Sequence, residues 1–320
     1  MLSRLSIVAN HLKHTHKGMS NSADPFKRPI HTAACLIIGD EVLNGKTVDT
    51  NSPYFARFCF DLGIELKRIE VISDDQDQIV EAARRMSANY DFVVTSGGIG
   101  PTHDDITYSS LAAAFGLPLR LHDETFRRMR LLSKHKVPFD WDTPSPTRTA
   151  RLRMAELPAG DNVRIVYVSD DTWVPVAIIN YNIHVLPGVP SIFASQLDGM
   201  KKLFEEEKRT EGKKLVRVLI STALPESEVA EYLTELQEKV GAKGVKVGSY
   251  PRWGKDHNTV TLVGKDEAYI ESLVKEVEEG VKGTRITVEG EDEPEEPKEE
   301  IKDGNIEQAK AADVKDAEAK

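Results

Sequence analysis

Residues 91–105, DFVVTSGGIGPTHDD, place a short apolar run directly before a loop with three glycines and two adjacent acids. The run at 91–95 predicts a buried strand, and a helix is expected at about 105–115, closed by Gly116. A strand, a glycine-rich loop and a helix in this order are typical of phosphate-binding turns. The spacing matches neither G-x-G-x-x-G nor G-x-x-x-x-G-K-S/T, so a tight turn without a ligand remains an alternative.

Strands and helices alternate on both sides of this loop. Helices are expected to begin near Asn51, with Pro53 in the first turn, and at Asp74 or Asp75. Further strands are expected at 32–38, 64–72, 164–168 and 174–180. This alternation predicts a three-layer α/β/α fold around a mostly parallel sheet, because parallel strands need helical crossovers.

A second, smaller pattern begins at Lys214. Its order is strand, helix, strand, strand, helix over about 75 residues, which predicts a compact α+β domain. We therefore expect an α/β domain at 31–205, with a flap or linker at about 138–152, and a small α+β domain at 213–288.

The two ends of the chain differ in composition from the middle. Residues 1–30 form a basic leader whose first 23 residues lack acids, as in a mitochondrial transit peptide, although a disordered leader is an alternative. A start at Met19 would remove the basic segment, so the expected location is cytoplasmic or mitochondrial. Residues 289–320 are rich in Glu, Asp, Lys and Ala and are predicted to be a disordered acidic tail.

Composition excludes several classes of function. The net charge of -10 argues against binding nucleic acid through a basic surface. No uncharged apolar run approaches the roughly 18–20 residues that a membrane span needs, so no membrane association is expected. Cys35 and Cys59 do not form a C-x-x-C pair and are expected to be buried thiols.

The glycine-rich loop combines two features that seldom occur together. Gly97, Gly98 and Gly100 are expected to present backbone N–H groups to phosphate oxygens. Adjacent carboxylates repel a phosphate unless a cation lies between them. We therefore expect Asp104 and Asp105 to be catalytic residues that anchor a divalent metal, magnesium, manganese or cobalt, which activates water. A simple helix cap by one acid is the alternative.

A second loop, GDEVLNGKTVDTN at 39–51, is expected to form the opposite wall of the site, because ligands collect beyond the carboxyl ends of parallel strands. Asp49 is a candidate catalytic residue, and Glu41, Asn51 and Thr102 are candidate substrate-binding residues. The water-activating base is left open between Asp49, Glu41 and a metal-bound hydroxide. A solvated turn is the alternative for this loop.

Three separated motifs, TSGGIGPTHDD, GDEVLNGKTVDTN and LPGVP at 186–190, together resemble the molybdopterin-binding-type domain of the MoaB/Mog superfamily. The longer form GGIGPTHDD is similar to the branch that contains the N-terminal domain of CinA proteins and the first domain of eukaryotic FAD synthases. The resemblance covers about 33–193, and residues 214–288 resemble the small domain that follows in this branch.

The resemblance implies a metal-dependent pyrophosphatase acting on FAD or ADP-ribose, with potassium as a second cation. Neither an amidohydrolase domain nor an FMN-adenylating domain is expected, for lack of chain, so the protein resembles a free-standing version. LPGVP is followed by Ser191, Ile192 and Phe193, where many relatives carry an acid. A carboxylate role at that position is therefore not expected.

The residues and the resemblance together predict hydrolysis of FAD to FMN and AMP, with ADP-ribose as the nearest rival substrate. A glycine-rich loop and paired acids suit a dinucleotide pyrophosphate. The alternatives are a molybdopterin-binding or adenylylating protein of molybdenum cofactor synthesis and a catalytically silent nucleotide-binding module. A small-molecule dinucleotide is the expected partner, and a homo-oligomer is left open.

Overall fold

The structure is a computed structural model that describes residues 24–133, 139–251 and 257–288. The chain divides into two compact units, Met1–Leu215 and Val216–Lys320, and each is described by itself. Most of the predicted leader and all of the predicted acidic tail lie outside the described residues.

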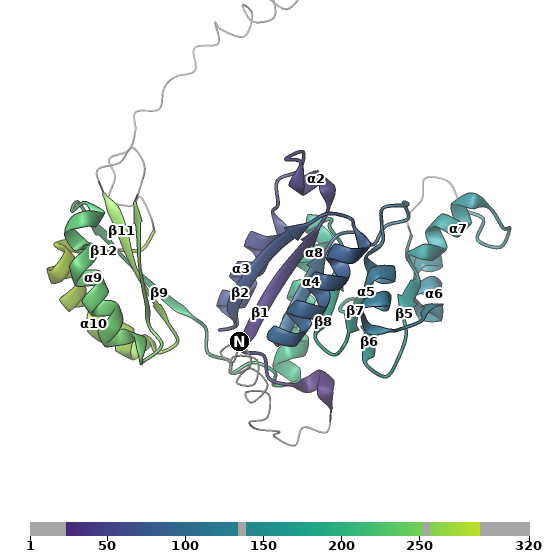
Figure 1. The fold of residues 1–320 in the computed structure, drawn as a ribbon. Coiled ribbons are helices and arrows are strands. Elements are labelled where there is room, and N and C mark those ends of the chain that lie inside the picture. The colour runs from purple at the N-terminus through teal and green to yellow at the C-terminus, as the bar shows by residue number, and fades with distance from the viewer. Residues whose placement is uncertain (1–23, 134–138, 252–256, 289–320) are drawn as a thin grey trace, which may run out of the picture. The chain divides into compact units, whose positions relative to one another are not determined.

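The larger unit is built on one six-stranded sheet (Figure 1). Its strands are β1 (Thr32–Ile38), β2 (Glu65–Ile72), β3 (Phe92–Ser96), β6 (Val163–Val166), β7 (Val176–Ile179) and β8 (Ile183–Leu186). They lie in the order β2-β1-β3-β8-β7-β6. The first four are parallel, whereas β7 and β6 are antiparallel to their neighbours, so the sheet is mostly parallel, as predicted.

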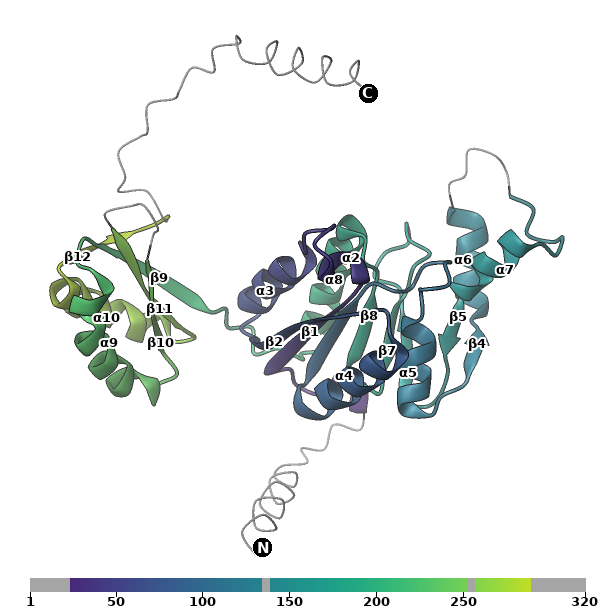
Figure 2. The same cartoon turned by 45° about the horizontal axis from the view of Figure 1, so that its top comes forward.

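Helices cover both faces of this sheet (Figure 2). On one face lie α3 (Asn51–Asp61) and α8 (Pro190–Glu206), and on the other α4 (Gln76–Asn89) and α5 (Thr107–Phe115). A sheet buried on both faces explains continuous apolar strands such as TAACLII at β1. The predicted three-layer α/β/α class is confirmed.

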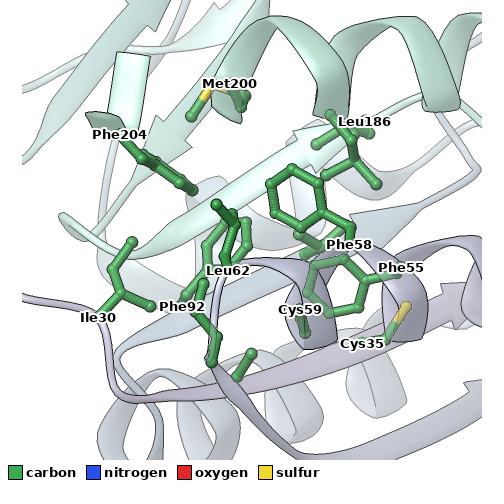
Figure 3. Packing of buried hydrophobic residues seen from close by; sticks show 14 of the residues in the cluster. Ile30, Cys35, Phe55, Phe58, Cys59, Leu62, Phe92, Leu186, Met200 and Phe204 are labelled. Atoms are coloured by element: carbon green, nitrogen blue, oxygen red, sulfur yellow. The ribbon is translucent and has the colours of Figure 1, made fainter. Parts of the chain in front are cut away.

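Aromatic side chains fill the core between the sheet and the α3/α8 layer (Figure 3). The ring centroid of Phe92 lies 5.4 Å from that of Phe55 and 5.1 Å from that of Phe204, both in edge-to-face arrangements. Successive residues of β1 face opposite layers, with Cys35 in this core and Leu36 in the core beneath α4 and α5. Both cysteines are buried free thiols, as predicted.

A small extension follows α5. It consists of β4 (Leu119–Leu121), α6 (Asp123–Leu132), α7 (Pro146–Arg153) and β5 (Glu156–Pro158). β4 and β5 pair as antiparallel strands, and Trp141 is buried in a separate core between the helices. The stretch predicted as a flap or linker at 138–152 thus contains helix α7, which starts with a Ser145 side-chain cap.

The smaller unit is an antiparallel four-stranded sheet with two helices. Its elements are β9 (Val216–Thr222), α9 (Glu226–Gly241), β10 (Lys246–Pro251), β11 (Asn258–Gly264), α10 (Glu267–Val281) and β12 (Gly283–Ile286). The strand order is β10-β11-β9-β12. The predicted strand and helix pattern is confirmed, and β12 is an additional strand. No helix among the described residues of either unit is long and apolar enough to cross a membrane.

Candidate functional site

The candidate site lies at the carboxyl ends of the parallel strands. Ile38 pairs with Ile72, Ile37 with Ser96, and Ser96 with Leu186. The loops that follow β1, β2, β3 and β8 therefore leave the sheet side by side. This edge is where open α/β sheets bind their ligands.

The turn after β3 depends on two glycines. Gly97 and Gly98 have φ angles of +109° and +65°, which side chains rarely adopt. A Cβ on Gly97 would overlap the Ile38 carbonyl oxygen, and a Cβ on Gly98 would overlap the Thr107 hydroxyl. Thr107 fixes the turn, because its N–H donates to Gly98 O and its Oγ1 donates to Gly97 O, both at 2.9 Å. The turn is thus held between β1 and the first residue of α5.

The three predicted backbone donors are not equivalent. Gly97 N–H donates to Leu186 O at 3.3 Å, and Gly100 N–H donates to Asp105 Oδ1 at 2.6 Å. Gly98 N–H has no hydrogen-bond partner within the described part of the chain. Of the three N–H groups, only that of Gly98 is thus without a protein partner in the described residues, and the phosphate contacts of all three glycines stay predictions.

Asp105 closes the glycine-rich loop on itself. Its carboxylate accepts hydrogen bonds from Gly100 N–H, Thr102 N–H and the Thr102 hydroxyl. Short polar side chains before a helix commonly find donors in their own loop. Asp105 and Thr102 thus shape the loop, and their metal-anchoring and substrate-binding roles stay predictions. α5 begins at Thr107 rather than at Asp105.

Asp74, which follows β2, belongs to the site but was not predicted to. Its Oδ2 accepts the Asp40 N–H at 3.0 Å, and a Cβ on Gly98 would lie 3.5 Å from its Oδ1, so the carboxylate borders the glycine turn. Burial raises the pKa of Asp74, and the negative charges of Asp40, Glu41 and Asp104 raise it further. The hydrogen bond from Asp40 N–H lowers this pKa but does not cancel the rise. We call these four side chains the acidic group.

Glu41 lies in the short helix α2 (Asp40–Leu43). Its carboxylate folds back over Gly39, where an added Cβ would be 2.8 Å from either oxygen. Glu41 O also accepts the Thr47 N–H at 2.8 Å, which closes the loop. The structure brings Glu41 into the acidic group, and its contact with a substrate stays a prediction.

Asp104 is the exposed member of the acidic group. Its side chain is 59% exposed, and that of the neighbouring His103 is 95% exposed, with 3.8 Å between His103 Nδ1 and Asp104 Oδ1. No set of three or more His, Cys, Asp or Glu side chains among the described residues is placed to hold a metal by itself. A divalent cation at the acidic group would thus take further oxygen ligands from water or from a bound phosphate, as magnesium commonly does.

Asp49 and Asn51 join α3 to the site. The Asp49 carboxylate accepts the N–H groups of Asn51 and Ser52 at 2.9 and 3.0 Å and the Ser52 hydroxyl, so Asp49, rather than Asn51, caps α3. Asn51 is buried, and its Nδ2 donates to Ser96 Oγ and to Gly188 O, both at 2.9 Å. These contacts suit Asp49 and Asn51 to a positioning role, and their catalytic and substrate-binding roles stay predictions.

A pocket of about 340 Å³ adjoins the glycine-rich loop. Its lining comes from the loop, α5, β4, α7 and β5: Ile99, Gly100, Thr102, His103, Asp105, Ile106, Tyr108, Ser109, Leu119, Arg153 and Glu156. Arg153 and Glu156 give the pocket one cationic and one anionic side chain opposite the loop. Its volume falls at the lower end of small-molecule sites.

The chain is similar to proteins of two kinds. A probable FAD synthase of Caenorhabditis elegans is 34% identical over 231 residues, which cover 69% of this chain and 44% of that protein. A CinA-like protein of Anaeromyxobacter dehalogenans is 29% identical, over 81% of this chain and 61% of that protein. The chain thus spans less than half of the first relative and less than two thirds of the second. The crystal structure of CinA from Thermoplasma acidophilum, a protein of unknown function, matches 54% of this chain and 97% of its own at 30% identity, with a TM-score of 0.46.

Two family models match successive parts of the chain. Residues 214–289, which make up most of the described smaller unit, match the middle domain of FAD synthase. Residues 34–206, which contain the glycine turn, the acidic group and the LPGVP loop, match the probable molybdopterin binding domain. Because this second match covers more than half of the chain, the protein belongs to the family of probable molybdopterin binding domains, in agreement with the resemblance of its three motifs.

Proposed function

We propose that the protein hydrolyses the pyrophosphate bond of FAD, releasing FMN and AMP. The observation that carries this proposal is that Gly98, whose N–H has no hydrogen-bond partner among the described residues, lies beside Asp74 of the acidic group. A backbone donor suits a phosphate oxygen, and a group of carboxylates next to a phosphate requires a cation. The match of residues 214–289 to the FAD synthase middle domain supports a flavin dinucleotide as the substrate.

The acidic group fits a divalent metal, because burial and then the like charges around it raise the pKa of Asp74, and a cation would relieve that repulsion. Asp74 and Asp104 would hold the ion, which would supply charge neutralisation and an activated water. Gly98 would bind a phosphate oxygen, while Thr107 and Asp105 keep the turn in shape. Asp49 and Asn51 would fix the facing loop. Phosphoryl transfer depends mainly on such positioning and charge compensation.

A second candidate function is binding or adenylylation of molybdopterin, which the description of the family matched at 34–206 favours. ADP-ribose is a rival substrate for the same chemistry, because it shares the pyrophosphate. A catalytically silent nucleotide-binding module is the third reading.

The test is an assay of the purified chain with FAD or ADP-ribose, with and without magnesium, manganese or cobalt, in sodium or potassium buffer. We expect FMN release that needs a divalent metal. Asp104→Asn should slow FMN release by about a hundredfold, because it removes a metal-anchoring charge. Asp142→Asn, an exposed acid outside the site, is the matched control. If no FMN is released with any metal and the purified protein carries bound pterin, FAD hydrolysis is contradicted and the molybdopterin function is favoured.

A further inference from the structure

A second pocket lies at the opposite edge of the central sheet. It has a volume of about 300 Å³ and is lined by Pro25, Arg28, Ser87, Ala88, Asn89, Tyr90, Asp91, Asn180, Tyr181, Asn182 and Arg209. Asp91 and Asn182 directly precede β3 and β8, so this pocket is at the amino ends of the strands whose carboxyl ends carry the candidate site. We call it the amino-edge pocket.

Arg209 is a buried cation in this pocket. The residue is 2% exposed, and its Nε donates to Arg28 O at 3.2 Å. Its Nη1 is buried and has no hydrogen-bond partner within the described residues. Burial lowers the pKa of Arg209 to about 10, because the charged form is poorly solvated. A buried guanidinium with an unpaired N–H group is unfavourable unless an anion accepts that hydrogen bond and balances the charge.

Two of the protein's own carboxylates attract the charge of Arg209, Glu207 more strongly than Asp24. Glu207 Oε1 binds Arg164 Nη1 at 2.8 Å, whereas its buried Oε2 has no hydrogen-bond partner among the described residues. One glutamate thus faces two arginines, of which Arg164 is partly exposed, so the set has an excess positive charge. In the pocket wall, one oxygen of Asp91 accepts the N–H groups of His31 and Thr32 and the Thr32 hydroxyl. Asp24 adds the weakest attraction to Arg209.

The amide wall of the pocket is fixed in advance. Asn182 Nδ2 donates to Ser87 O at 2.9 Å and to Tyr90 O at 2.8 Å, and Asn180 Nδ2 donates to Ser87 Oγ at 2.9 Å. Asn180 and Tyr181 have φ angles of +49° and +68°, and a left-handed conformation is unfavourable for tyrosine. A strained turn locked by hydrogen bonds lowers the entropy lost on binding a small ligand.

We propose that the amino-edge pocket binds a phosphate group, held by the guanidinium groups of Arg209 and Arg28. Guanidinium forks match phosphate oxygens in pairs, and two of them suit a doubly charged anion. Arg28 is exposed, and no ion-pair partner of its side chain occurs among the described residues. The ligand is either inorganic phosphate or a small phosphate monoester, since the rest of the lining includes side-chain amides and two tyrosines.

The test is thermal unfolding of the full chain in sodium phosphate, in AMP and in sodium chloride at equal ionic strength. At a hundredfold excess over Kd, the wild-type Tm should rise by about 5–10 °C with the phosphate ligand and not with chloride. Stabilisation by inorganic phosphate identifies the free ion as sufficient, and stabilisation by AMP alone identifies a monoester.

Three variants locate the effect. Arg209→Met should abolish the shift, because it removes the guanidinium that holds the phosphate. Arg28→Gln, on the surface, should weaken calorimetrically measured binding by about tenfold and carries the test alone if Arg209→Met does not fold. Arg153→Gln, in the pocket beside the glycine-rich loop, is the matched control and should keep the shift. The proposal is overturned if no phosphate ligand exceeds chloride, or if only Arg153→Gln loses the shift.

Discussion

Alanine variants of two glycines with similar φ angles can separate the cost of backbone strain from the loss of a contact at the candidate site. Gly98 and Gly116 have φ angles of +65° and +64°, but an added Cβ meets the Thr107 hydroxyl at Gly98 and nothing within 4 Å at Gly116. Gly98→Ala should lower the free energy of unfolding by about 1 kcal/mol for the backbone and by about 1 kcal/mol more for the disturbed Thr107 hydrogen bond. Gly116→Ala should show only the first effect.

Urea denaturation measures this difference, and FMN release measures its consequence for the site. Gly98→Ala should raise KM for FAD, because the shifted turn presents its N–H wrongly, whereas Gly116→Ala should have wild-type kinetics. Identical stability and kinetics in the two variants would show that Gly98 has no special role.

The raised pKa of Asp74 predicts a variant that is more stable and less active. Between the ordinary pKa of 3.8 and the raised value, the folded state holds a proton that the unfolded state has lost, so stability falls as pH rises through this range. At pH 7 the ionised carboxylate is therefore destabilising. Asp74→Asn should unfold at higher urea than wild type at pH 7 but not at pH 3, and should release FMN about a hundredfold more slowly. Asp75→Asn, which keeps the cap of α4, should match wild type in both assays. Wild-type turnover by Asp74→Asn would remove Asp74 from the site.

The glycine turn could be predicted from the sequence, but its hydrogen bonds could not. Three glycines between a strand and a helix imply unusual φ angles, which Gly97 and Gly98 have. Whether each N–H remains available depends on where Asp105 and Leu186 place their oxygens. Asp74 was missed because it meets Asp40 and Asp104, each about 30 residues away, only after β1, β2 and β3 have paired.

At the scale of elements, the start of α3 allows a test of whether Asp49 caps the helix or takes part in catalysis. Asp49→Asn keeps a capping oxygen, and Asp49→Ala removes it, so only the second should lose about 1 kcal/mol of stability. If Asp49 is a positioning residue, Asp49→Asn should retain most FMN release, and Asp49→Ala should lose part of it as Asn51 shifts against Ser96 and Gly188. Loss of turnover in both variants with full stability in Asp49→Asn would support the predicted catalytic role. Chemical denaturation and steady-state kinetics on the same preparations decide between them.

The helices and strands that could be predicted from the sequence have a clear hydrophobic periodicity. Three elements that were not predicted, α8, β8 and α7, show what limits such prediction. Helix α8 carries Phe193, Leu197, Met200 and Phe204 at helical spacing, so the signal was present but was read only as the LPGVP motif. β8 has four residues, too few for a reliable alternation, and one of them is histidine. Helix α7 is polar and starts in a proline-rich stretch, which is typical of a linker.

For the whole molecule, the two-part organisation followed from the change of pattern near Lys214, which agrees with the division between Leu215 and Val216. The order of the strands could not be predicted, because it depends on packing between distant segments. β6 and β7 come before β8 in the chain, yet β8 is the strand that pairs with β3. β7 and β6 then extend the sheet on the far side of β8. This order places His184 of β8 in the middle of the sheet.

His184 makes the stability of the α/β unit depend on pH. The side chain is fully buried against Phe92 and Phe204, and its Nε2 has no hydrogen-bond partner among the described residues. Burial, with the nearby charge of Arg209, lowers its pKa to about 3. The unfolded chain binds this proton at its ordinary pKa of 6.5, so stability is complete above pH 6.5 and falls as pH decreases towards 3.

We expect His184 to cost the folded state about 3 kcal/mol of stability between pH 7 and pH 4.5. His184→Leu has no proton to gain and fills the same apolar site, so its free energy of unfolding should decline less over this range, whatever its value at pH 7. His103→Gln is the matched control, because the His103 side chain is 95% exposed and lies outside the core, so its loss should leave the slope unchanged. Urea unfolding followed by tryptophan fluorescence at half-unit pH steps measures the three slopes. If wild type and His184→Leu lose stability in parallel, the acid sensitivity arises from carboxylates, and the buried imidazole does not control it.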